Sequence, residues 1–205
     1  MILILDYGTG NTGSILNMLK KIGAEASITS DPGALREATA IILPGIGAFD
    51  NGMSKLERFI VPLEQKVLEE KVPFLGICLG MQLLLERSDE GTRAGLGWIP
   101  GEVKKFSFTH TQKKLKVPHM GWNVVSPARE DGLFNGFEEE ARFYFVHTYH
   151  AVVKHKEHTL GTTVYGYDFA SAIHKDNIFG VQFHPEKSHK FGMNLLKNFI
   201  SLSLC

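Results

Sequence analysis

The chain has 205 residues, of which 43% are hydrophobic and 21% charged, a composition that excludes intrinsic disorder and predicts a single domain over residues 1–205. Its 22 Lys and Arg balance 22 Asp and Glu, and this net charge of zero argues against a protein that binds nucleic acid. Because no apolar run approaches the roughly 20 residues that cross a bilayer and the N-terminus lacks a signal-peptide pattern, we expect a cytoplasmic protein that does not bind membranes.

The first half of the chain alternates short apolar runs with stretches in which apolar residues recur at helical spacing. The longest of these stretches, residues 53–71, carries its apolar side chains on one face and leads into the apolar run at residues 72–77. Alternation of this kind predicts a mostly parallel central sheet flanked by helices. The predicted strands are residues 1–7, 26–30, 40–43 and 72–77, and the predicted helices are residues 14–24, 35–38, 53–71 and 81–87.

The second half of the chain is aromatic and β-branched between turn signals, with no long helical pattern until its end. Residues 104–125 and 141–153 predict antiparallel strands. Residues 177–185 (NIFGVQFHP) predict a further strand, and residues 190–202 predict a final amphipathic helix. We therefore expect an α/β fold in which a mostly parallel sheet, flanked by helices, carries an antiparallel β extension.

The loop after the first predicted strand matches the dinucleotide-binding pattern G-x-G-x-x-G at Gly8, Gly10 and Gly13. It lies where a pyrophosphate would meet a helix N-terminus, and Asp31 follows at about the spacing of the ribose-binding acid. Against this interpretation, the chain is short for two mononucleotide halves and a substrate domain, and glycines also serve turns that need positive φ. A dinucleotide-binding module therefore stands as the alternative of a different functional class.

The strongest chemical signal is Cys78, at the centre of the pentapeptide GICLG at residues 76–80. This is the nucleophile-elbow pattern G-x-S-x-G with cysteine in place of serine, between a predicted strand and a predicted helix. The flanking glycines allow a sharp turn that presents the thiol at the carboxyl edge of the sheet, and a helix N-terminus favours the reactive thiolate. A lone cysteine is otherwise most often a buried core thiol, so this interpretation needs partner residues.

A thiolate nucleophile needs an imidazole to protonate the leaving group and a third group to orient that imidazole. His184 and Glu186 lie at the carboxyl end of the last predicted strand, at the edge of a parallel sheet where active sites gather. In an extended chain these two positions share a face, so they predict a triad with Cys78. Without the elbow, the same two residues would indicate only a surface histidine beside an unrelated carboxylate.

Acyl transfer also needs an oxyanion hole, usually two backbone N–H groups directed at the developing charge. The amide of Leu79, the residue after the nucleophile, is the expected first donor. Gly45 and Ile46 follow the strand 40–43 in a glycine-rich loop, PGIG at 44–47, that allows a peptide N–H to turn toward the thiol. We expect the second donor in this loop, although the same sequence also suits an ordinary strand-terminating turn.

The motifs PGIGAFDNGM, GICLGMQ and FHPEKS, in this order, resemble the class I, triad-type glutamine amidotransferases, and the match runs nearly end to end. Within this family, DYGTGN, PHMGWN at 118–123 and YFVHTYH at 144–150 are similar to the glutaminase subunits of imidazole glycerol phosphate synthases. The resemblance implies that glutamine is hydrolysed to glutamate through a γ-glutamyl thioester on Cys78, without a cofactor. It also implies that ammonia passes to a separate (β/α)8-barrel cyclase subunit in a heterodimer that makes imidazole glycerol phosphate and AICAR in histidine biosynthesis.

The resemblance further implies two sets of residues outside the triad. The residues expected to hold glutamine, with the second and third at its charged α-groups, are Gly47, Gln82, Glu90, Thr148 and Tyr149. The residues expected to dock the cyclase are Tyr7, Asn11, Met120, Trp122, Asn123, Tyr144 and Lys187. Family members are also implied to be weakly active until the cyclase binds its ligand, which a peptide of the 44–47 loop pointing away from the thiol would explain.

Other interpretations stay open at this point. After FHPEKS the sequence reads HKFGM at 189–193, which is similar to paralogues that supply ammonia to a sugar-modifying enzyme of surface-polysaccharide synthesis. A catalytically inactive regulatory subunit would keep the elbow only as structure, and the presence of all three triad residue types argues against it. The nine histidines form no ligand pattern such as H-E-x-x-H, so we expect no metal site.

Overall fold

The computed structural model describes residues 1–109, 115–129, 132–137 and 140–202. The strands in these ranges are β1 (Ile2–Leu5), β2 (Ala26–Thr29), β3 (Ala40–Gly45), β4 (Phe74–Cys78), β5 (Arg87–Ser88), β6 (Gly101–Lys105), β7 (His119–Pro127), β8 (Ala141–His147), β9 (Tyr149–Val153), β10 (Thr159–Val164), β11 (Asp168–Lys175) and β12 (Ile178–Val181). The α-helices are α1 (Thr12–Lys21), α2 (Phe49–Leu56), α3 (Ile60–Glu64), α4 (Leu79–Gln82) and α5 (His189–Leu202).

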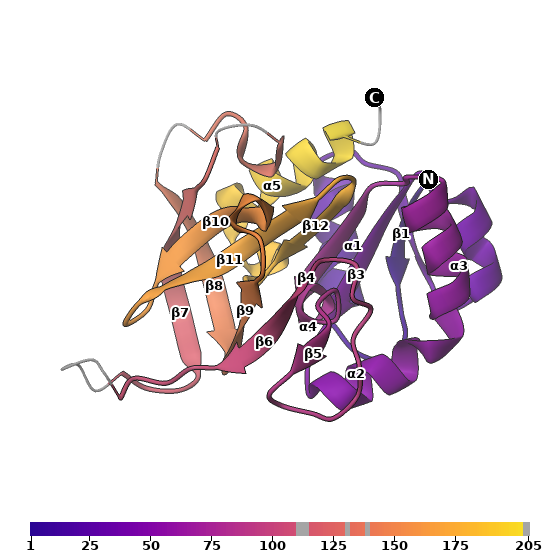
Figure 1. Cartoon of the computed structure of the whole chain (residues 1–205). Coiled ribbons are helices and arrows are strands. Elements are labelled where there is room, and N and C mark those ends of the chain that lie inside the picture. Colours follow the sequence, from indigo (N-terminus) through magenta and orange to yellow (C-terminus); the bar gives the residue numbers. More distant parts are fainter. Residues whose placement is uncertain (110–114, 130–131, 138–139, 203–205) are drawn as a thin grey trace.

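The described strands form one sheet with the order β2-β1-β3-β4-β12-β11-β10-β7-β8, and β9, β6 and β5 are attached beside this path (Figure 1). From β2 to β12 along this path neighbouring strands are parallel, and from β12 through β11, β10 and β7 to β8 neighbouring strands are antiparallel. The expected α/β fold, a mostly parallel central sheet with an antiparallel extension, is confirmed.

Side-chain alternation along the parallel strands divides the core between the two faces of the sheet. On β1, Ile2 and Ile4 belong to a buried cluster that also contains side chains of α1 and α5. Leu3 and Leu5, on the opposite face of the same strand, belong to a second cluster with side chains of α2 and α3. Helices therefore cover both faces of the sheet, as the sequence pattern predicts.

Two predicted helices differ from the structure. The stretch 53–71 is not one helix, because α2 and α3 are separated by a 3-10 turn at Glu57–Phe59 and α3 is followed by a π-helical turn at Gln65–Glu69. Pro62 lacks the N–H that a continuous helix needs at that position. The predicted helix 81–87 is also wrong beyond Gln82, since the N–H of Glu86 already donates to the carbonyl of Gly101 on β6.

No α-helix within the described residues is long and apolar enough to span a membrane.

Candidate active site

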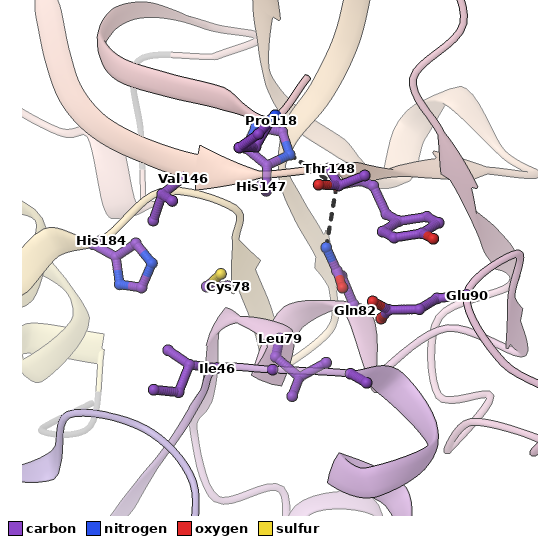
Figure 2. Close-up of a pocket in the computed structure, with 13 residues that line it drawn as sticks. Ile46, Cys78, Leu79, Gln82, Glu90, Pro118, Val146, His147, Thr148 and His184 are labelled. Carbon is purple, nitrogen blue, oxygen red and sulfur yellow. Dashed lines mark hydrogen bonds between the residues drawn. The ribbon is translucent and has the colours of Figure 1, made fainter. Parts of the chain in front are cut away.

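Three neighbouring parallel strands, β3, β4 and β12, end at the same edge of the sheet, beside a cavity of about 470 Å³ (Figure 2). Cys78 is the last residue of β4, and His184 follows β12 closely. The topology thus joins segments about a hundred residues apart in sequence. The cavity is lined by Ile46, Gly47, Ala48, Cys78, Leu79, Gln82, Glu90, Pro118, Val146, His147, Thr148, Tyr149 and His184.

Cys78 sits in a strained backbone turn between β4 and α4. Its φ of 56° and ψ of −108° are rarely adopted by a residue other than glycine, as expected for a nucleophile elbow. A Cβ at Gly80 would overlap the carbonyl oxygen of Leu43 on β3, and a Cβ at Gly76 would lie 2.6 Å from the carbonyl oxygen of Gly80. The two flanking glycines therefore permit the close approach that holds the strained turn in place.

The helix after the nucleophile is shorter than the sequence predicts. α4 is a single turn, Leu79–Gln82, so its dipole contributes less to a thiolate at Cys78 than a full helix would. Two side chains that closely follow β12 interact with the sulfur instead. His184 interacts with it from the cavity side, and Gln182 places its side-chain nitrogen 3.7 Å from it.

His184 and Glu186 form a buried pair, with 2.8 Å between Nδ1 of the imidazole and Oε1 of the carboxylate. Their side chains are 3% and 2% exposed. The two residues do not lie in extended chain as expected, because Pro185–Lys187 form a 3-10 turn that folds the carboxylate back onto Nδ1. The other ring nitrogen, Nε2, therefore remains for an interaction with Cys78. Figure 2 shows the imidazole beside the sulfur.

The environment of His184 favours its charged form. Burial lowers the pKa of the imidazole, but hydrogen bonds and electrostatic attraction to Cys78 and Glu186 more than offset this effect and raise the pKa to about 10. At neutral pH the imidazole of His184 is therefore charged and lies beside the sulfur of Cys78. An ion pair of a thiolate with such an imidazolium is the reactive state of a cysteine nucleophile with a histidine acid.

The predicted oxyanion donors differ in how they are placed. Leu79 lines the cavity directly after the nucleophile, whereas the peptide of Ile46 is bound elsewhere. The N–H of Ile46 donates to Oγ1 of Thr9 at 3.1 Å, and the Thr9 hydroxyl in turn donates to the carbonyl oxygen of Ile46. Gly45 is buried within β3 and does not line the cavity. In this conformation one expected oxyanion donor is therefore engaged by a side chain of the first loop.

The residues expected to hold glutamine all line the cavity. Figure 2 shows three of them, Gln82, Glu90 and Thr148, on the side away from His184. Nε2 of Gln82 donates to the carbonyl oxygen of Tyr149 at 3.1 Å and to Oε1 of Gln182 at 3.0 Å, which leaves only its amide oxygen for a ligand. Oε2 of Glu90 accepts from the backbone N–H of Phe49 at 2.8 Å. A carboxylate and an amide oxygen thus face the same end of the cavity, where a cationic ammonium group would find acceptors.

The residues expected to dock a partner are divided by their exposure. Met120 is 62% exposed and Trp122 is 48% exposed on β7. Tyr144 is half-buried, with the ammonium of Lys187 5.7 Å from its ring centroid. Tyr7 is only 3% exposed, so its side chain is not on the surface as expected; burial and the neighbouring Cys78 raise the pKa of its phenol far above the ordinary value.

The other two expected docking residues make structural hydrogen bonds. Asn11 is exposed and caps α1, where Oδ1 accepts from the N–H of Ser14 at 3.3 Å. Asn123 is partly buried and donates from Nδ2 to the carbonyl oxygen of Val164 at 3.0 Å and to the ring of His119 at 3.2 Å. Both asparagines therefore fix local structure beside the exposed side chains.

A pair of buried histidines next to the cavity is a feature that the sequence reasoning missed. Nδ1 of His147 lies 2.8 Å from the carbonyl oxygen of Tyr149, and its Nε2 lies 2.9 Å from Nδ1 of His119. Burial lowers the pKa of His147 to about 3 and that of His119 to about 4, so both rings are neutral. Because a carbonyl only accepts, His147 must carry its proton on Nδ1, and His119 must then donate from its own Nδ1.

The glycine-rich loop at residues 8–13 packs against the loop at residues 44–47. Gly10 has φ of 104°, and a Cβ there would lie 3.0 Å from Cβ of Pro44. Thr9 binds the Ile46 peptide, so the loop contacts the cavity wall through two of its residues.

Within the described ranges, no group of three or more His, Cys, Asp or Glu side chains could hold a metal ion.

Comparison with known proteins agrees with this geometry. The family model described as glutamine amidotransferase class-I matches residues 3–202. Imidazole glycerol phosphate synthase subunit HisH 2 of Methanococcus maripaludis is 52% identical over 202 residues, 98% of either chain. Its namesake of Pseudomonas aeruginosa is 47% identical over 204 residues, 98% of this chain and 100% of that relative. A crystal structure of a glutamine amidotransferase, 16% identical, covers 100% of both chains with a TM-score of 0.74, a likeness of fold alone.

Proposed function

The chain belongs to the class-I glutamine amidotransferase family, and we propose that it is the glutaminase subunit of an imidazole glycerol phosphate synthase. In this proposal it hydrolyses glutamine to glutamate and passes the ammonia to a (β/α)8-barrel cyclase subunit, with which it forms a cytoplasmic heterodimer of histidine biosynthesis. The observation that carries the chemistry is that Cys78 and His184 meet in the wall of one cavity, with the buried carboxylate of Glu186 bound to the other side of the His184 ring.

The first half of the reaction uses the ion pair. The Cys78 thiolate attacks the side-chain carboxamide carbon of glutamine, and a negative charge develops on the carboxamide oxygen. The backbone N–H of Leu79 is the donor best placed to stabilise that charge. When the tetrahedral intermediate collapses, the carbon–nitrogen bond breaks and the His184 imidazolium donates a proton to the departing nitrogen. The products of this half are ammonia, a γ-glutamyl thioester and a neutral imidazole.

The second half regenerates the enzyme. The neutral His184 accepts a proton from water, and the resulting hydroxide attacks the thioester carbon. Collapse of the second intermediate breaks the carbon–sulfur bond, which releases glutamate and restores the thiolate beside an imidazolium. The carboxylate of Glu186 can only accept a hydrogen bond, so it keeps a proton on Nδ1 of His184. It thereby fixes the tautomer and the orientation of the imidazole in both halves of the reaction.

The α-groups of glutamine meet the opposite end of the cavity. We place its ammonium between the carboxylate of Glu90 and the amide oxygen of Gln82, since the Gln82 amide hydrogens are already donated. The carbonyl of Tyr149 accepts from both Gln82 and His147. We therefore expect glutamine to contact the other backbone groups of residues 148–149, together with Gly47, which also lines the cavity.

The cyclase would dock on the exposed apolar side chains near the cavity. Met120 and Trp122 lie on β7, and Ile46, which is 53% exposed, lines the cavity itself. Exposed methionine and tryptophan are enriched at the centres of protein interfaces, and Lys187 adds a cation that a partner carboxylate would pair with. A partner seated there would cover the cavity mouth, which keeps ammonia away from bulk water.

A second candidate partner rests on the segment 189–193. His189 stacks on Trp122, with 5.5 Å between ring centroids and 4° between ring planes, so the residue that departs from the family pattern touches a proposed docking residue. The alternative is therefore a sugar-modifying enzyme of surface-polysaccharide synthesis, with the same glutaminase chemistry.

Measuring glutamate release with each partner distinguishes the two. The chain is combined with the cyclase from the same source and its nucleotide ligand, and separately with the sugar-modifying enzyme. We expect at least a tenfold rise in turnover with the liganded cyclase only. A rise with the sugar-modifying enzyme alone would replace the histidine-pathway proposal, and no rise with either would remove both partners.

A further inference from the structure

Gln182 lies beside the nucleophile on the core side of the sheet. β12 pairs with β4 in parallel, with Val181 opposite Ile77, so the next residues of the two strands, Gln182 and Cys78, are neighbours. Gln182 is fully buried, and its backbone N–H donates to the carbonyl oxygen of Ser171 at 2.9 Å. The β-sheet register therefore delivers a buried amide side chain to the sulfur.

The contact reaches the sulfur from behind the cavity. Nε2 of Gln182 lies 3.7 Å from Sγ of Cys78, within the range of a hydrogen bond to sulfur. Gln182 is not among the residues that line the cavity, whereas His184 is. The amide of Gln182 thus contacts the sulfur without lining the substrate cavity.

The direction of this hydrogen bond follows from the acceptors around it. The carbonyl oxygen of Tyr149 accepts but cannot donate, so the Gln82 atom 3.1 Å from it must be the amide nitrogen. The same nitrogen lies 3.0 Å from the side chain of Gln182, which must therefore present its oxygen there. That orientation turns the amide nitrogen of Gln182, with its hydrogens, toward the sulfur.

We propose that Gln182 is a further catalytic residue, whose side-chain amide donates a hydrogen bond to the Cys78 sulfur and stabilises the thiolate. A hydrogen bond to a charged acceptor is stronger than one to a neutral acceptor, so the bond favours the thiolate over the thiol. Gln82 acts on the sulfur only through Gln182 and is a positioning residue in this respect. This role offsets the short dipole of α4, which leaves the thiolate without the support of a full helix.

The direct test is the pH dependence of Cys78 alkylation by iodoacetamide in the free chain. The Gln182→Met variant removes the amide at similar volume, and we expect the midpoint of the alkylation rate to move up by about one pH unit, a tenfold loss of rate at lower pH. The Gln82→Met variant frees the Gln182 amide to rotate and should shift the midpoint in the same direction by less. Alkylation of Cys78→Ala sets the background from other thiols.

Asn177→Leu is the matched control, because it removes an amide at the other end of the same strand. The Asn177 side chain donates to the carbonyls of Val67 and Val72 at 2.8 Å each, away from the cavity. Its loss should lower the thermal stability without moving the alkylation midpoint. If Gln182→Met does not fold, the Gln82→Met profile decides. An unchanged midpoint in a folded variant of either residue would overturn the proposal.

The proposal rests on the proposed function only through the nucleophile, and alkylation needs no glutamine, so the two fail separately. In the complex with the cyclase, Gln182→Met should lower kcat for glutamate release about tenfold and leave KM within about twofold, because Gln182 does not line the cavity and the carbonyl of Tyr149 still holds the Gln82 amide. A rise in KM with unchanged kcat would indicate a structural effect on the substrate site and would contradict the assignment.

Discussion

The hydroxyl of Thr9 holds the peptide of Ile46 away from the sulfur of Cys78. Thr9 accepts from the Ile46 N–H at 3.1 Å and donates to the Ile46 carbonyl oxygen, so both polar groups of this residue are bound to one side chain. In the proposed mechanism Leu79 is therefore the oxyanion donor available at rest, and the N–H of Ile46 becomes the second donor only when its contact with Thr9 breaks.

Thr9→Val should raise glutamine turnover of the free chain. Valine has a similar volume but cannot hold the Ile46 peptide, so the peptide turns more readily toward the oxyanion. One oxyanion donor accounts for a factor on the order of 10² to 10³ in rate, and we expect part of it, about tenfold, to appear without a partner. Thr9→Ser, which keeps the hydroxyl, is the control and should remain at the resting rate. Equal turnover of Thr9→Val and Thr9→Ser would mean that Thr9 does not restrain the loop.

His184 predicts a pH dependence of stability. Its pKa is raised from 6.5 to about 10 in the folded chain, so the stabilisation that its charged form contributes is complete below about pH 6.5 and is lost as the pH rises toward 10. Urea unfolding at pH 6, 8 and 10 measures this. The free energy of unfolding of the wild type should fall across this interval more steeply than that of His184→Gln. Parallel curves for the two proteins would contradict the charged state of His184.

His147 offers a test of how the substrate end of the cavity is held. Its Nδ1–H donates to the Tyr149 carbonyl that also binds Gln82. His147→Asn can keep a donor near the position of Nδ1, whereas His147→Gln keeps only the position of Nε2. We expect KM for glutamine to rise about fivefold in His147→Gln and by less than about twofold in His147→Asn, since one hydrogen bond is worth about 1 kcal/mol. The same KM in both variants would show that the hydrogen bond to Tyr149 does not position the site.

Trp122 tests the docking surface. We expect Trp122→Ala to weaken binding of the cyclase by at least about 30-fold, because a central tryptophan commonly contributes 2 kcal/mol or more to an interface. Val61→Ala is the control, since Val61 is 74% exposed on α3, outside the proposed docking surface. Isothermal titration calorimetry with the cyclase gives both dissociation constants. An unchanged constant for Trp122→Ala would move the docking surface elsewhere.

Much of the fold is readable from the sequence because its signals are local. Alternation of apolar strands and amphipathic helices predicts the parallel half, and the elbow at residues 76–80 predicts where the chain turns. The helix 81–87 was predicted wrongly because the backbone of Glu86 pairs with Gly101, a contact between distant segments that no local pattern contains. The continuous apolar face of residues 53–71 favours one helix, whereas Pro62 lacks the N–H that a single helix needs there.

Some residues of the site are likewise predictable from local sequence patterns, and others are not. Cys78 and His184 carry motif signals, and both line the cavity. Gln182 lies two residues before His184 at the same strand end, a spacing that offered a signal for a third polar group on the sulfur. The contact of Thr9 with Ile46 and the pairing of His119 with His147 join segments that only the folded sheet brings together. Sequence spacing alone could not supply them.

The most direct test of the account is glutamate release in the complex with the liganded cyclase, measured for the wild type and for Cys78→Ala, with mass spectrometry of the peptide that contains residue 78. We expect rapid release of glutamate and a γ-glutamyl adduct on Cys78 in the wild type, and neither in a folded Cys78→Ala variant. Glutamate release by Cys78→Ala at the wild-type rate would contradict it.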